Sequence, residues 1–63
     1  MPAALLSRDE VAEILGVTLG TVKNLIRRGE IRIVQIGTRV MIDPADLEEF
    51  IAERKTYRVE DAS

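Results

Sequence analysis

The chain has 63 residues, a formal net charge of −2, and neither cysteine nor histidine. This length allows one small domain without a deep substrate pocket. The missing residue types exclude disulfides and thiolate metal sites and remove the commonest general base, so we expect no enzymatic activity, no metal and no cofactor. No apolar run reaches the ~20 residues of a membrane span, and the start does not resemble a secretory signal, so a cytoplasmic location is expected.

The first predicted helix follows Leu6. Ser7 and Glu10 have the S-x-x-E spacing of a capping box, and Leu6 can form a hydrophobic staple with the first turn. Gly16 suits the left-handed position that ends a helix. The apolar face has the spacing i, i+3, i+4; it consists of Val11, Ile14 and Leu15.

A second helix is predicted over Leu19 to Arg28, with Thr18 as its cap and Gly29 at its end. Only Gly16 and Val17 separate its cap from the first helix, which is typical of a helix-turn-helix. We expect Val17 to be buried in this turn. The face toward the core has the same i, i+3, i+4 spacing; it consists of Val22, Leu25 and Ile26.

The pattern then changes to β-branched residues over 31–36, which favours a strand. Gly37-Thr38 is a hairpin connection to a second strand at residues 40–42. Two strands are too few for an independent sheet, so the hairpin is expected to pack on the helices.

A third helix is predicted from Asp43 as cap and Pro44 as first residue, with a core stripe of Leu47, Phe50 and Ile51. The residues after this helix show only a weak apolar periodicity. We therefore expect a mostly α-helical winged helix-turn-helix with a small β-hairpin wing over residues 1–55, followed by a loosely ordered tail over 56–63. Tyr57 and Val59 in the tail are candidates for docking on the domain or on a neighbour.

Charge is unevenly distributed along the chain. Residues 18–41 carry five cations and one acid, a net charge of +4, whereas residues 1–17 carry −2 and residues 42–63 carry −4. Once the core positions of the second helix are assigned, its exposed face is polar and basic. A solvated helix face usually mixes both signs, so this face indicates contact with nucleic-acid phosphates.

The candidate DNA-binding residues on this helix combine several kinds of contact. Lys and Arg neutralise phosphates, Arg or Lys can bind guanine, Asn can pair with adenine, and Thr hydroxyls at a helix start can donate to phosphate. A glycine allows close approach of the backbone. These residues are Thr18, Gly20, Thr21, Lys23, Asn24, Arg27 and Arg28, with Arg39 beyond the hairpin tip.

Alternative interpretations stay open for several of them. The three cations of the second helix can form an ordinary solvated face. Asn24 can be a neutral surface residue, and Arg39 can be a hairpin-edge charge that prevents strand pairing. Ser7 is first a helix cap, with a phosphate contact as the second possibility.

Residues Leu5 to Ile51 resemble the excisionase-like, MerR-related winged helix-turn-helix family. The resemblance rests on the opening Leu-Leu-Ser, "EVAEILGV", "TVKNLIRRGEI", "IGTRVMI" and the acidic third helix ending in Phe-Ile. It implies a recognition helix at Thr18–Arg28 and a wing at Gly37-Thr38-Arg39, which adds Thr38 to the DNA-binding residues. Family members often carry Arg or Ser where this chain has Leu19-Gly20. We therefore expect this helix to recognise DNA more through phosphate contacts and DNA shape than through contacts with the bases.

Three functions are to be distinguished, and the resemblance implies the first two of them. The first is an excisionase-type architectural protein in a bacterial or phage-infected cell. Such a protein binds tandem sites on double-stranded DNA cooperatively, bends them and directs an integrase toward excision, with head-to-tail self-association. The second is a small transcription regulator that binds promoter DNA. The third is a protein–protein adaptor without DNA binding. A ligand-sensing role is not expected, because the sequence lacks the effector domain of longer MerR relatives.

Overall fold

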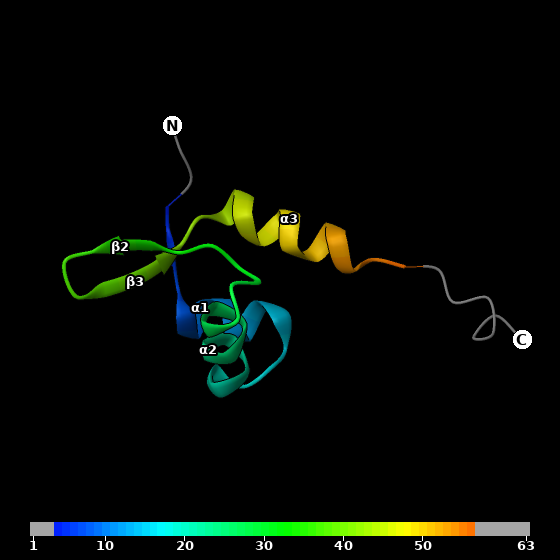
Figure 1. Cartoon of the computed structure of the whole chain (residues 1–63), viewed down its shortest axis with the longest axis horizontal. Helices are drawn as coiled ribbons and strands as arrows, with labels where there is room; N and C mark the ends of the chain where they lie inside the picture. The colour runs from blue at the N-terminus through cyan, green and yellow to red at the C-terminus, as the bar shows by residue number, and fades with distance from the viewer. Residues whose placement is uncertain (1–3, 57–63) are drawn as a thin grey trace, which may run out of the picture.

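Two helices, a small sheet and a third helix make up the computed structural model, which describes residues 4–56 (Figure 1). The elements are β1 (Leu6–Ser7), α1 (Arg8–Leu15), α2 (Leu19–Arg27), β2 (Val34–Ile36), β3 (Arg39–Ile42) and α3 (Pro44–Arg54). The predicted winged helix-turn-helix is confirmed. Tyr57, Val59 and most of the predicted tail lie outside the described residues, so the division at residue 55 stays a prediction.

Local capping signals set the bounds of the first two helices. The Ser7 hydroxyl accepts from the Glu10 amide at 3.1 Å, and the Glu10 carboxylate accepts from the Ser7 amide at 2.8 Å, which confirms the capping box. Gly16 and Gly29 have φ values of 72° and 73°, the left-handed conformation that ends a helix. The predicted end of α2 was one residue too late, because Arg28 is its C-cap.

The sheet has three strands in the order β1-β3-β2, all antiparallel, whereas the sequence predicted only a two-stranded hairpin. Leu6 pairs with Ile42 and Ser7 with Met41, so the segment that caps α1 also completes the sheet. A strand of two residues is too short to show an alternating pattern. The second hairpin strand therefore has partners on both edges.

The hairpin itself begins later than predicted. Its ladder runs from Val34↔Met41 to Ile36↔Arg39, across the two-residue turn Gly37-Thr38. Gly37 has a φ of 61° and Thr38 has no positive φ, which matches the glycine-first type II′ turn. Residues 31–33 lie outside β2. Ile31 is buried in the core instead of continuing the strand.

The core brings together every element except β2, and its buried residues are Val11, Ala12, Val22, Ile31, Ile42, Leu47 and Phe50. The predicted inward position of Ile14 is wrong, because 56% of its surface is exposed. Helix α1 is rotated so that the small Ala12 lies inward and Ile14 outward. Val17 is also exposed rather than buried in the turn.

Helix α3 lies on the opposite side of the hairpin's base from α1 and α2 (Figure 1). Asp43 caps it by accepting from the Ala45 amide at 2.9 Å, and Pro44 is its first residue, as predicted. The predicted stripe also holds, since Leu47 and Phe50 are buried and Ile51 packs against the core. Helix α3 is thereby fixed beside the helix-turn-helix unit.

Candidate nucleic-acid interface

All nine candidate residues of the sequence are exposed, and they lie on α2, its N-cap and C-cap, and the hairpin. The α2 core face, with Val22 buried and Leu25 and Ile26 half-buried, fixes which side of this helix is outward. Lys23, Asn24 and Arg27 therefore share the solvent side. Sequence periodicity alone placed these three residues correctly, because they belong to one regular helix.

The start of α2 is built around two threonines. The Thr18 hydroxyl accepts from the Thr21 amide at 3.2 Å, and the two hydroxyls are 3.1 Å apart. Gly20 has free space at its Cα, since a Cβ there meets only the Thr18 hydroxyl at 3.8 Å. The helix start therefore presents two threonine hydroxyls and, at Gly20, a backbone position that no side chain covers.

Arg27 is held along the helix by its neighbour one turn earlier. Its Nη2 donates to the Asn24 Oδ1 at 2.6 Å. A bidentate contact of an asparagine with adenine uses both the amide oxygen and the amide nitrogen. Asn24 must therefore exchange this bond to read adenine, whereas Arg27 keeps further N–H groups for a phosphate or a base.

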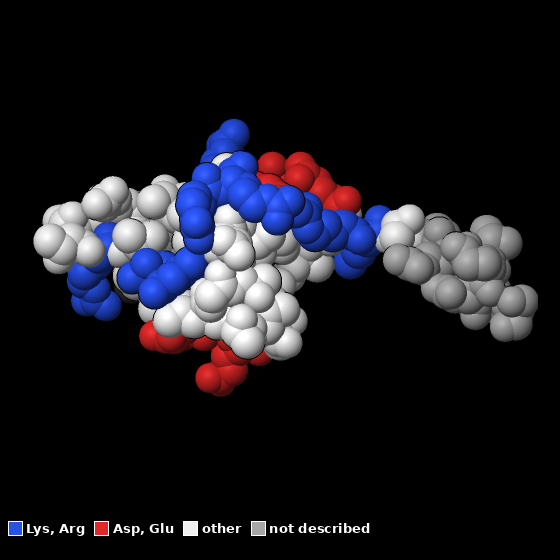
Figure 2. All heavy atoms as spheres, turned by 60° about the horizontal axis from the view of Figure 1, so that its bottom comes forward, with Lys and Arg blue, Asp and Glu red and all other residues white. Residues whose placement is uncertain are grey.

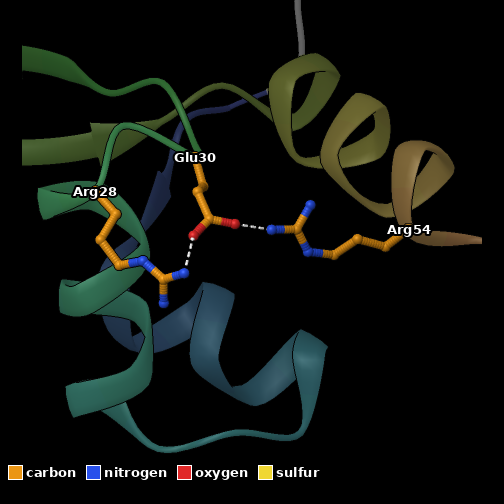
Figure 3. A network of polar contacts seen from close by, with 3 residues as sticks. All are labelled: Arg28, Glu30 and Arg54. Carbon is orange, nitrogen blue, oxygen red and sulfur yellow. Dashed lines mark hydrogen bonds and ion pairs between the residues drawn. The ribbon is translucent and has the colours of Figure 1, made fainter.

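Arg28 lies in a different environment from the other α2 cations. Its guanidinium forms an ion pair with Glu30 at 2.9 Å, and Arg54 from the end of α3 reaches the same carboxylate from the other side (Figure 3). Arg54 also lies over the Phe50 ring, 4.0 Å from its centroid. Arg28 is thus partly neutralised, which makes it a weaker candidate for a phosphate contact than Arg27.

A shallow depression of about 270 Å³ lies where the start of α1, the outer side of α2 and the hairpin meet. Its lining comprises Ser7, Arg8, Asp9, Leu19, Lys23, Thr38, Arg39, Val40 and Met41. The fold thereby brings Lys23 together with the two wing candidates. The remaining candidates do not line the depression and lie elsewhere on α2 and its two caps.

Arg8 is the residue that sequence reasoning missed. Arg8 lies in the acidic N-terminal third of the sequence, so the charge distribution did not single it out. In the fold it lines the same depression as Lys23 and Arg39. One local signal was available: Arg8 is the first residue of α1, where the helix dipole disfavours a cation. A cation at the positive end of a helix dipole is a reason to look for a partner outside the helix.

Positive and negative side chains are separated on the surface. Figure 2 shows Lys and Arg as a band across one face, with Asp and Glu gathered at its margins. A second hollow has a mainly acidic lining that includes Glu30, Asp46, Glu49 and Glu53, together with Gly29, Ile31, Phe50 and the single cation Arg32. This separation gives the domain a basic and an acidic surface.

Within residues 4–56, no helix is long and apolar enough to cross a membrane. The same residues contain no group of three or more acidic side chains arranged to hold a metal ion. A family model described as a helix-turn-helix domain matches residues 5–55. Comparison with curated proteins and with solved structures gave no match.

Proposed function

The chain belongs to the helix-turn-helix domain family, which indicates a DNA-binding protein, and from this premise we propose that α2 enters the major groove while the hairpin contacts the adjacent backbone. The observation that carries the proposal is the set of exposed cations on α2 and the hairpin. Lys23, Arg27 and Arg39 form no ion pair with any other described residue. Their charge is therefore available to phosphates.

The proposed contacts divide by position on the interface. Thr18, Gly20 and Thr21 lie at the start of α2, where amide groups and hydroxyls favour a phosphate. Asn24 and Arg27 supply base or phosphate contacts in the groove. Thr38 and Arg39 contact the backbone from the hairpin, and Arg28 adds a weaker contact because it shares Glu30 with Arg54.

Replacement of Arg27 by Ala tests the recognition face. We expect DNA affinity to fall by about 1–3 kcal/mol while the thermal midpoint stays close to that of the wild type. Arg32→Ala is the matched control, because Arg32 is an exposed arginine that lines the acidic hollow and not the basic depression. Fluorescence anisotropy with duplex DNA at several salt concentrations measures both variants. Equal affinities of the two variants would contradict the assignment of α2 as the recognition helix.

We further propose an excisionase-type role, in which copies bind tandem sites, bend the DNA and direct an integrase toward excision. The separated charge supports this role: the acidic hollow of one copy is complementary to the basic face of the next, which gives a head-to-tail contact. A heterologous contact of this kind can continue along the DNA. A single small module buries only about 600–1,000 Å² on DNA, so neighbouring copies add the affinity that one copy lacks.

Cooperativity is measured as the affinity for two adjacent sites relative to one site. We expect Glu53→Gln, in the acidic hollow, to lower this ratio. Glu13→Gln, on the exposed side of α1, changes the net charge equally and is expected to leave it unchanged. Stepwise, non-cooperative complexes of the wild type in gel shifts would contradict self-association on DNA.

Excision is tested with a plasmid that carries attachment sites and a candidate integrase. We expect excised product only when the protein is added, and none with Arg27→Ala. A promoter reporter distinguishes the alternative, a transcription regulator: repression or activation without any effect on excision favours that role. Absence of any DNA shift at low salt would instead favour a protein–protein adaptor.

A further inference from the structure

Three cations from three separate elements surround the depression between α1, α2 and the hairpin. Arg8 is the first residue of α1, Lys23 lies one turn into α2, and Arg39 begins β3. None of the three forms an ion pair with another residue of the 4–56 segment. The one acid in the lining, Asp9, leaves the depression with a net positive charge.

Several features raise the electrostatic cost of this arrangement in the absence of a ligand. Like charges that converge on one surface repel each other, and Arg8 also faces the positive end of the α1 dipole. Arg8 is only half-exposed, and Val40 and Met41 contribute apolar surface to the lining. A concave site with partly apolar walls concentrates the positive potential, so an anion placed there relieves all of these costs together.

The depression also supplies neutral donors. The Ser7 hydroxyl oxygen accepts from the Glu10 amide, which leaves its own O–H as a donor for a ligand in the depression. The Thr38 side chain lies in the same lining at the hairpin turn. Two hydroxyls and three cations match the donors that proteins offer to a phosphate group.

We propose that this depression binds a single phosphodiester group of the DNA backbone, with Arg8 as a phosphate ligand beside Lys23 and Arg39. The inference rests on the proposed DNA-binding function and deepens it. One phosphate held by α1, α2 and the hairpin together fixes the position of the recognition helix relative to the wing. The open shape of the depression fits a group that enters as part of a long duplex rather than an enclosed free anion.

The salt dependence of DNA binding provides the first test. The slope of log K against log salt is about −0.9 for each phosphate that is neutralised. We expect Arg8→Gln to make the slope shallower by about 0.9 relative to Arg32→Gln, a control with the same change in net charge. Equal slopes for the two variants, with the wild type binding DNA, would overturn the phosphate site and leave the proposed function intact. Absence of DNA binding by the wild type at low salt would overturn both.

The second test locates the phosphate. Duplexes that carry a neutral methylphosphonate at one backbone position at a time are bound to the wild type and to Arg8→Gln. We expect one position at which the modification weakens the wild type about tenfold and the variant hardly at all, because both changes remove the same contact. Additive losses at every position would overturn the assignment.

Arg8→Gln should weaken DNA binding without lowering the stability of the protein, which separates a ligand role from a structural one. Removal of the Arg8 charge from the positive end of α1 is expected to leave the thermal midpoint equal or higher, while DNA affinity falls. A lower midpoint with unchanged slope would overturn the inference. A last experiment measures thermal unfolding in millimolar inorganic phosphate. If phosphate stabilises the wild type but not Arg8→Gln, and Arg8→Gln does not change DNA binding, the site binds a free anion and the backbone assignment is overturned.

Discussion

The carboxylate of Glu30 links the end of α2 to the end of α3, and its neutralisation by Glu30→Gln tests how far this link holds the two helices together. Glu30 pairs with Arg28 at 2.9 Å and with Arg54 (Figure 3). The side chain of Glu30 is 25% exposed, that of Arg54 45% and that of Arg28 69%. The substitution keeps the shape of the side chain and removes its charge.

The expected loss follows from these exposures. Exposed ion pairs contribute about 0.2–1 kcal/mol each. The Arg28 pair belongs at the lower end because the Arg28 side chain is mostly exposed, and the Arg54 pair belongs at the upper end because Arg54 also lies on the Phe50 ring. Together they contribute about 1 kcal/mol, which corresponds to a decrease of roughly 4–8 °C in the thermal midpoint of so small a domain.

Thermal unfolding followed by circular dichroism measures this decrease. Glu49→Gln is the control, since Glu49 is exposed on α3 and pairs with no described cation. In ~1 M salt the screening length falls to about 3 Å, so the gap between the variants is expected to narrow. Equal midpoints of the two variants at low salt would refute the stabilising role of the link.

Further substitutions separate backbone, core and capping effects, all read from urea or thermal unfolding. Gly20→Ala is expected to stabilise the protein by about 0.5–1 kcal/mol, because Gly20 is helical and its Cβ position is open, and to weaken DNA binding measured by anisotropy. Gly29→Ala is expected to destabilise by about 1–2 kcal/mol, since φ is 73° there; a gain would contradict the left-handed conformation. Ile42→Ala removes a fully buried side chain and is expected to cost about 2–5 kcal/mol, comparable with the whole stability of such a domain. Ser7→Ala removes the α1 cap and is expected to cost about 1 kcal/mol; no loss would contradict the capping box.

The sequence by itself determined the three helices and the place of the hairpin between the second and the third. Ser7, Thr18 and Asp43 begin helices because a side-chain oxygen accepts from an amide two or three residues later. Gly16 and Gly29 end helices because glycine tolerates a positive φ. These interactions join residues close in the chain, so their pattern is visible in the sequence. The outward face of α2 was predictable for the same reason.

Tertiary structure decided the features that depend on what packs against each element. Ile14 fits the apolar spacing of α1 but is exposed to solvent, because the elements that pack on α1 bury Val11 and Ala12 instead. Strand β1 exists only because β3 has a free edge beside it. Likewise Arg8 lines one depression with Lys23 and Arg39, and Glu30 pairs with Arg54, across long separations in sequence. These arrangements depend on how the elements pack, so the local periodicity of the sequence does not predict them.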